Sequence, residues 1–227
     1  MYHSICEHIG KEKHNKWIVK PKDFEKQMKW FYDNKWNSFT ISELIKLDEI
    51  PKKSFVVTFD DGYEDNFINA FPILKKYNFK ATIYLVPNQS INHWEEKNTS
   101  VLSNLLNNEQ ILQMQNTGLI EFGSHTLSHV NLSTINDEQL LIELKKSKEE
   151  IEKITRKECE AFAYPYGKFD DKIIQAVEEI GYKNATVVKR GLFEKNDNPF
   201  IIKRIGILGT ESFVDFLLKV TRIRNKL

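Results

Sequence analysis

Short apolar segments rich in β-branched residues alternate with longer segments of helical spacing along most of this chain. Residues 54–59 and 81–86 form such segments, residues 161–164 form a further short apolar segment, and each of the three runs directly into Asp or Pro. Between them, apolar residues recur every three or four positions, which is typical of amphipathic helices. Strands that alternate with helices predict parallel βα units, because a crossover must carry the chain back to the start of the next parallel strand. We therefore expect one α/β domain, barrel-like in shape, over residues 1–227.

Caps and helix breakers place the individual boundaries. Asn136 is expected to cap the longest helix, Asp170 or Asp171 a later one, and Pro72 marks a late start or a kink. We expect helices over 24–31, 67–77, 109–116, 136–154, 171–180 and 213–220, and strands over 54–59, 81–86, 119–122, 161–164, 185–188 and 200–205. Residues 88–107 have weak periodicity and are expected to form an excursion above the barrel. The polar clusters follow strand ends, where a βα barrel keeps its active site.

The charges of the chain are nearly balanced. Its 33 Lys and Arg residues against 32 Asp and Glu residues leave a formal net charge of +1. This balance argues against nucleic acid, an anionic membrane or a polyanion as the general partner. Lys219, Arg222, Arg224 and Lys226 are the best candidates for a local basic patch.

Cysteine usage and the N-terminus predict the compartment. Cys6 and Cys159 lack the spacing of a disulfide framework or a zinc knuckle, so we expect a reduced protein. The first residues lack a basic start followed by an apolar run, and nowhere do about 18 apolar residues stand together. We therefore expect no signal peptide and no transmembrane segment, with a location in the cytoplasm or at its membrane surface.

Two adjacent carboxylates, Asp60 and Asp61, follow the apolar segment that ends at Phe59. Burying them is costly unless something binds them. Successive strand residues point in opposite directions, so a bend at Gly62 is needed to bring both to one opening. A metal ion would take one carboxylate and leave the other free as a base. The alternative is an ordinary Asp-Gly turn.

His125 and His129 stand four residues apart after another buried segment. They lie on one face if the segment is helical, with Ser124 as its cap. Joined to one of the two aspartates, they make a His₂-carboxylate set with positions left open for water and substrate. Such a set suits one divalent ion, Zn²⁺ first, with Co²⁺, Ni²⁺ or Fe²⁺ as alternatives, and hydrolysis by activated water.

Aromatic residues and a proline follow the segment 161–163. Tyr164, Pro165 and Tyr166, together with Tyr63 beside the aspartates, are candidate substrate-binding residues that would stack on a sugar. Backbone N–H groups of the same turn could stabilise a developing oxyanion. The alternative is that these side chains simply close the barrel.

These motifs resemble those of the polysaccharide deacetylase family, that is, carbohydrate esterase family four with its NodB-homology domain. The first motif matches over 58–62, the second over 125–129 and the third in part over 164–167. The opening residues 1–3 also resemble the first strand of many family members, and the segment 24–28 resembles the corresponding segment of these proteins. The resemblance thus covers most of the chain, and its motifs stand in the right order.

The resemblance implies a distorted (β/α)₇ barrel and hydrolysis of N-acetyl, less often O-acetyl, groups of a polysaccharide, oligosaccharide or glycolipid. By position, Asp61, His125 and His129 would bind the metal ion. Asp60 would be the general base, and the backbone N–H of Tyr166 would stabilise the oxyanion.

The chain departs from the family pattern at the arginine that often holds the catalytic aspartate. Ala163 stands three residues before Tyr166, where many members carry that arginine. The variant Ala-Tyr-Pro-Tyr-Gly resembles the branch that acts on exopolysaccharides. Arg204, at the end of an expected strand, is our candidate for the missing charge.

The fourth motif and the C-terminal histidine of the family are absent, since no tryptophan follows Trp94 and no histidine follows His129. The first and last strands of a closed barrel are neighbours, so His3 is the candidate general acid. His8, His14 and His93 have no such positional argument.

Three other interpretations stay open. A barrel that binds carbohydrate without turnover would explain the missing motif residues. A metal-dependent hydrolase of a small amide or cyclic imide would use the same centre. An Asp-based phosphotransfer site would hold Mg²⁺ by carboxylates and leave the two histidines idle.

Overall fold

A parallel five-stranded sheet forms the centre of the protein. The computed structural model describes residues 1–7, 16–96 and 103–221. The strands are hydrogen-bonded in chain order, each to the next. They are β5 (Val57–Phe59), β6 (Ala81–Leu85), β7 (Ile120–Ser124), β8 (Ala161–Ala163) and β9 (Asn184–Thr186). Their carboxyl ends therefore lie at the same edge, as expected for consecutive βα units.

Two irregular segments close this sheet into a ring. Tyr2 pairs in parallel with Phe59 at one edge, and Ile202 pairs with Thr186 at the other. The ring closes where Ile207 N–H donates to the carbonyl oxygen of Met1, 3.0 Å away. The predicted distorted βα barrel is confirmed. The strand expected over 200–205 is reduced to the bridge at Ile202, because the segment pairs with β9 at Ile202 and already with Met1 at Ile205 and Ile207.

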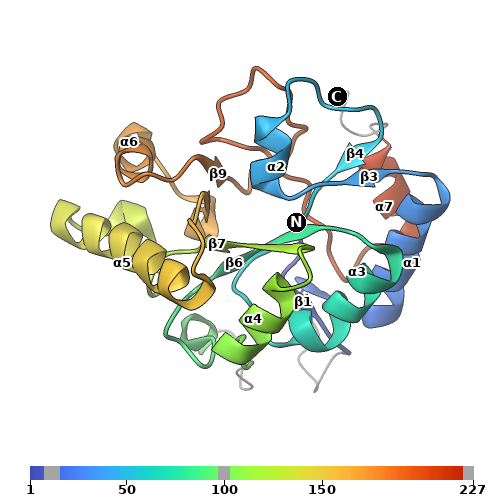
Figure 1. Cartoon of the computed structure of the whole chain (residues 1–227), viewed down its shortest axis with the longest axis horizontal. Helices are drawn as coiled ribbons and strands as arrows, with labels where there is room; N and C mark the ends of the chain where they lie inside the picture. The colour runs from blue at the N-terminus through green and yellow to red at the C-terminus, as the bar shows by residue number, and fades with distance from the viewer. Residues whose placement is uncertain (8–15, 97–102, 222–227) are drawn as a thin grey trace.

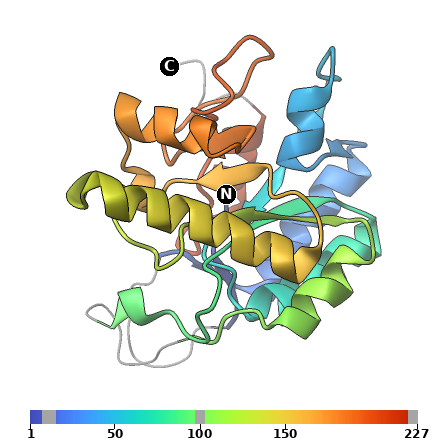
Figure 2. The ribbon, with the colours of Figure 1, turned by 60° about the vertical axis from the view of Figure 1, so that its left-hand side comes forward.

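Helices cover the outside of the ring, with α1, α3 and α7 on one side and α5 and α6 on the opposite side (Figure 1). The long α5 lies along the outside of the sheet against β7 (Figure 2). The helices are α1 (Pro21–Asp33), α2 (Ile41–Lys46), α3 (Phe71–Tyr77), α4 (Asn108–Gln115), α5 (Asp137–Thr155), α6 (Asp171–Glu179) and α7 (Phe213–Val220). Each expected helix is found, and α2 is an addition. No helix of the described segments is both long and apolar enough to cross a membrane.

Caps and prolines act where the sequence places them. The side chain of Asn136 accepts a hydrogen bond from Gln139 N–H at the start of α5, and Asp170 caps α6 in the same way. Each such cap stabilises its helix by about 1 kcal/mol. Pro72 lies in the first turn of α3, and a π-helical turn, η1 (Asn66–Ala70), precedes it. The chain is helical on both sides of Pro72, so the proline marks a change from a π-helical turn to α-helical turns and not a late start, because it has no N–H to donate within the helix.

Two short sheets flank the ring. The first pairs β1 (Ser4–Ile5) with β2 (Ile18–Val19), and the second pairs β3 (Asn37–Ser38) with β4 (Ser54–Phe55). The single strand expected over 54–59 is therefore two strands, because its first half pairs with β3 and its second half with β6.

Of the four cations expected to form a C-terminal basic patch, Lys219 alone lies among the described residues. Lys219 is buried, and its ammonium group donates to Gly206 O and contacts Glu211. An ammonium group paired in this way presents no free positive charge to a partner. Arg222, Arg224 and Lys226 lie outside the described residues.

Candidate metal centre

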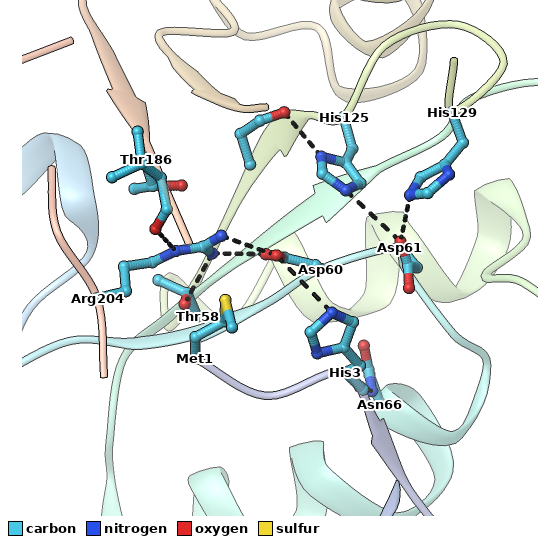
Figure 3. Close-up of polar contacts among 12 residues, drawn as sticks. Met1, His3, Thr58, Asp60, Asp61, Asn66, His125, His129, Thr186 and Arg204 are labelled. Carbon is cyan, nitrogen blue, oxygen red and sulfur yellow. Dashed lines mark hydrogen bonds and ion pairs between the residues drawn. The ribbon is translucent and has the colours of Figure 1, made fainter. Parts of the chain in front are cut away.

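Asp60 and Asp61 stand at the carboxyl end of β5 and point to different neighbours. Asp61 and Gly62 both have left-handed backbone conformations, with φ of 74° and 72°. The bend thus begins one residue earlier than expected, at a side chain for which this conformation costs roughly 1–2 kcal/mol. A Cβ on Gly62 would lie 2.8 Å from the end of the Leu85 side chain and would be strained at this φ, so both the contact and the backbone conformation favour glycine. Figure 3 shows the result: Asp60 faces Arg204 and His3, whereas Asp61 faces the two histidines.

Asp61, His125 and His129 gather into one buried cluster. One ligand atom from each lies within 4.8 Å of the other two. Asp61 Oδ1 is 3.6 Å from His125 Nε2 and 3.2 Å from His129 Nε2. This buried oxygen accepts no hydrogen bond from any described residue. A buried carboxylate oxygen without a donor is costly unless it binds a cation, so the donor set fits a divalent metal ion.

His125 is held as a neutral ligand. Its Nδ1 lies 2.7 Å from the carbonyl oxygen of Ala163, which can only accept, so Nδ1 carries the proton and Nε2 keeps its lone pair for a metal. Burial, reinforced by the neighbouring His129, lowers the pKa of His125 to about 4. The imidazole is therefore neutral at pH 7, which is the form that binds metal.

The segment from His125 to His129 is a loop, not the helix that the four-residue spacing favoured. Thr126 and His129 have positive φ values of 68° and 57°. Two left-handed residues turn the chain sharply, and this turn brings the second imidazole back toward the first. Their ring centroids lie 4.9 Å apart. A helix is thus not needed to bring the two histidines together.

Asp60 forms a bidentate ion pair with Arg204. The two nitrogen–oxygen distances are 2.6 Å and 2.8 Å, and both side chains are only 4% exposed. The guanidinium also donates to Thr58 Oγ1 and to the carbonyl oxygen of Val187. Burial raises the pKa of Asp60, but the charge and hydrogen bonds of Arg204 outweigh it and hold the pKa well below its usual range. Asp60 is therefore ionised and fixed in orientation.

Arg204 contacts Asp60, the carboxylate for which the sequence made it the candidate partner. Its guanidinium reaches Asp60 from the irregular segment that follows the bridge at Ile202. Ala163 itself is fully buried in β8. Arg204, which follows the bridge at Ile202, thus makes the contact with Asp60 that an arginine at position 163 in β8 would otherwise make.

His3 lies on the opposite side of Asp60 from Arg204 (Figure 3). Its Nε2 is 4.0 Å from Asp60 Oδ2, and its ring packs on Trp17 with 4.5 Å between centroids. Burial lowers the pKa of His3, although Asp61 and Asp60 oppose that effect. His93 instead contacts Glu96, and His8 and His14 lie outside the described residues.

The third motif divides into a buried part and an exposed part. Tyr164 is fully buried and donates its hydroxyl to the carbonyl oxygen of Phe200, so its expected place on a sugar-binding wall is wrong. Pro165 and Tyr63 are buried as well. Tyr166 is 53% exposed, has a left-handed φ of 57°, and its Oη lies 3.2 Å from His129 Nδ1. Of these four candidates, Tyr166 alone offers an aromatic face to solvent.

Trp94 is a site residue that the sequence did not reveal. It lies in η2 (His93–Glu95), within the expected excursion, and stacks on His129 with 4.4 Å between centroids and 20° between planes. Tyr166 meets the same imidazole nearly edge-on, at 71°. The pairing of Tyr63 with Leu105 ties the excursion to the aspartate turn. No periodicity marks an isolated tryptophan in a single short helical turn, so its position emerges only in the folded chain.

Glu143 is the second residue without a sequence signal. It lies on α5, and its carboxylate accepts hydrogen bonds from the backbone N–H groups of Leu127 and Ser128, at 2.9 Å and 3.0 Å. In sequence it is one of many charges on the polar face of an amphipathic helix. Only the folded chain shows that it touches the loop between the two histidines.

Fold and site together define a βα-barrel protein with a buried Asp-His-His cluster beside an arginine-paired aspartate. Comparison with known proteins names the family: the polysaccharide deacetylase model matches residues 48–185. The chain belongs to the polysaccharide deacetylase family.

Relatives and solved structures agree with this assignment. The chain is 31% identical over 198 residues to the poly-β-1,6-N-acetyl-D-glucosamine N-deacetylase of Staphylococcus aureus (strain MRSA252), an alignment that covers 82% of this chain and 67% of the relative. The crystal structure of BC0361, a polysaccharide deacetylase from Bacillus cereus, matches with a TM-score of 0.81 and 32% identity, over 96% of this chain and 67% of the other. The Streptococcus pyogenes deacetylase PplD, solved in complex with acetate, matches with a TM-score of 0.82 and 27% identity, over 96% and 95%.

Proposed function

We propose that this protein is a metal-dependent deacetylase that removes N-acetyl groups from the sugars of a polysaccharide, oligosaccharide or glycolipid. One observation carries the proposal: two adjacent aspartates are divided between two tasks. Asp61 joins the two histidines, whereas Asp60 is held apart by Arg204. A metal-dependent hydrolase needs such a division, because it requires one carboxylate as a ligand and a second as a base. The staphylococcal relative, named for N-deacetylation of a poly-N-acetylglucosamine, supports this substrate class.

Asp61, His125 and His129 would hold the ion. Two imidazoles and one carboxylate suit Zn²⁺, with Co²⁺, Ni²⁺ or Fe²⁺ as alternatives, and leave coordination positions open. A bound divalent ion supplies Lewis acidity, which lowers the pKa of water and polarises a carbonyl group.

The proton movements fall to Asp60 and His3. Asp60 accepts the proton of the attacking water as the new bond to the acetyl carbon forms. The carbon–nitrogen bond then breaks, the proton ends on the sugar amine, and acetate leaves. His3, 4.0 Å from Asp60, is the side chain to which that proton would pass on its way to the amine. Its pKa is lowered by burial, so His3 is neutral in the free protein and becomes an acid only after receiving a proton.

Arg204 orients the base, and the turn at Tyr166 faces the developing charge. The bidentate contact fixes both carboxylate oxygens of Asp60 and keeps it ionised, at some cost in basicity. Tyr166 is the middle residue of η4 (Pro165–Gly167), and its N–H precedes the first hydrogen bond of the turn, which Gly167 N–H makes to the carbonyl oxygen of Tyr164. Its N–H is the proposed donor to the oxyanion.

Zinc titration of the metal-free protein, followed by acetate release, tests the proposal. Calorimetry should find one tight site in the wild type that is lost in Asp61→Ala and His125→Ala. His93→Ala is the matched control, because this histidine contacts Glu96 and joins no group of metal-ligand side chains among the residues that the structure describes. The loaded wild type should then release acetate from N-acetylglucosamine oligomers. Absence of a tight site would overturn the metal centre, whereas a tight site without acetate release from any acetylated sugar would favour a binding protein.

A further inference from the structure

The loop between the two histidine ligands is a strained element. β7 ends at Ser124, and two of the next five residues, Thr126 and His129, have left-handed backbone conformations. Each such residue costs roughly 1–2 kcal/mol, so the surroundings must hold the loop in place. The hydroxyl of Thr126 is buried without a hydrogen-bond partner among the described residues and gives no such support.

Glu143 makes three hydrogen bonds to the middle of this loop. Its Oε2 accepts from Leu127 N–H at 2.9 Å and from Ser128 N–H at 3.0 Å, and its Oε1 accepts from Ser128 Oγ at 2.5 Å. Hydrogen bonds to an ionised carboxylate are roughly twice as strong as those between neutral groups. One side chain thus satisfies two successive backbone donors between the two ligands.

The helix that carries Glu143 is itself fixed against the barrel. Leu144 is fully buried in the core, and Ser147 Oγ lies 2.7 Å from Ser124 Oγ at the end of β7. The carboxylate therefore projects from a rigid element onto the loop. By contrast, His125 directly follows β7 and has its own anchor at Ala163. Support from α5 thus matters most for His129.

We infer that Glu143 is a positioning residue, which holds the loop so that the His129 imidazole stays within reach of the metal site. The inference rests on the proposed metal centre and adds to it a residue that never touches the ion. Loss of partners that orient metal ligands typically weakens metal binding about 10- to 100-fold.

Zinc and cobalt binding by the metal-free variants provide the test. Glu143→Ala should weaken calorimetric zinc affinity by about 10-fold or more, and should change the visible absorption of the cobalt form, which reports the ligand geometry. Glu143→Gln keeps one acceptor oxygen and should weaken binding less. Ser128→Ala removes only the hydroxyl bond and should weaken it least. Glu149→Gln is the control on the same helix, since its partners are Lys145 and Lys146.

Separate outcomes judge the inference and the function on which it rests. A lower melting temperature of metal-free Glu143→Ala with unchanged zinc affinity and cobalt spectrum would reduce Glu143 to a purely structural role. If Glu143→Ala does not fold, wild-type affinity in both Glu143→Gln and Ser128→Ala would overturn the inference. A wild type without a tight zinc site would overturn the metal centre and the inference together. If Glu143→Ala shows the expected loss of zinc affinity but the wild type releases no acetate, the positioning role stands and only the proposed activity is overturned.

Discussion

The two halves of the site are built in different ways. Asp60 belongs to the closed barrel: its partners come from the first and last segments of the ring, and its ion pair with Arg204 is almost completely buried. His129 belongs to a loop with left-handed residues, is held through Glu143, and has Trp94 and Tyr166 on its ring. One half is fixed by sheet closure, and the other by side chains that reach onto a loop.

This difference matches the chemistry proposed for each half. A base must remain charged and fixed, and a buried bidentate pair provides this as long as both partners are present. A metal ligand and the aromatic walls around it must admit a bulky sugar, which suits loops positioned by a rigid scaffold. Changes in the barrel half should therefore affect turnover and stability, whereas changes in the loop half should affect metal or substrate binding.

Asp60→Asn should have the largest effect on the barrel half. It removes the proton acceptor and should lower kcat by about 10²–10⁴-fold, the range of general acid–base catalysis. Zinc affinity should stay within a few-fold of wild type, because the ligands are untouched. Rates of acetate release and zinc calorimetry check the two statements. Wild-type kcat would remove Asp60 as the base.

Arg204→Ala should lower both stability and activity. It leaves Asp60 buried and unpaired, which should reduce the free energy of unfolding at pH 7 by about 3–5 kcal/mol. Chemical denaturation measures this change. Arg204→Lys keeps the charge but loses the bidentate contact, so it should recover part of the stability and less of the activity.

The pH dependence of Arg204→Lys sharpens the same point. The folded pKa of Asp60 is depressed below its unfolded value, so the ion pair contributes stability above about pH 3.9, and this contribution is lost as the pH falls through the folded pKa. The lysine of this variant would lower the pKa of Asp60 less than the arginine does, so the effect of burial, which raises this pKa, would be opposed less. The acidic limb of kcat/KM should therefore move to higher pH in the variant. An unmoved limb would show that Arg204 does not control ionisation of the base.

His3→Ala should lower turnover by about 10²-fold or more if His3 carries the proton to the amine. His93→Ala is the matched control, since that histidine contacts Glu96. The measurement is kcat on an N-acetylglucosamine oligomer. An unchanged rate would eliminate His3 as the acid.

Trp94→Ala should have the smallest effect on turnover and should distinguish the loop half from the barrel half. The indole stacks on His129 and forms part of the aromatic surroundings of the site. Its loss should raise KM about tenfold, within the 1–3 kcal/mol expected for a truncated aromatic contact, while kcat changes less. Trp94→Phe should restore most of the affinity. A drop in kcat alone would place Trp94 with the catalytic groups instead.

Much of the fold followed from local patterns. Helix spacing, the caps Asn136 and Asp170, and the irregularity at Pro72, where a π-helical turn is followed by α3, are all short-range features, and the structure bears them out. The predicted strands were wrong where one segment pairs with two neighbours. The segment 54–59 pairs first with β3 and then with β6. The segment 200–205 forms only the bridge at Ile202. The division depends on strand pairing, which local periodicity does not encode.

The sequence by itself determined the βα order of the chain and the types of residue at its strand ends, because periodicity and caps act within a few positions. It also supplied His125, His129 and one of two adjacent aspartates as a group, since the carboxyl ends of parallel strands meet at one edge of the sheet. The resemblance to the deacetylase family then singled out Asp61. Arg204 was a candidate partner for Asp60 in the sequence, but the tertiary structure decided that the two side chains, 144 positions apart, form an ion pair. The tertiary structure also decided that Trp94 stacks on the ring of His129 and that Glu143 contacts the loop before His129. It placed Tyr164 in the core as well. These contacts depend on how the ring closes and how α5 lies against it, and no local pattern specifies either.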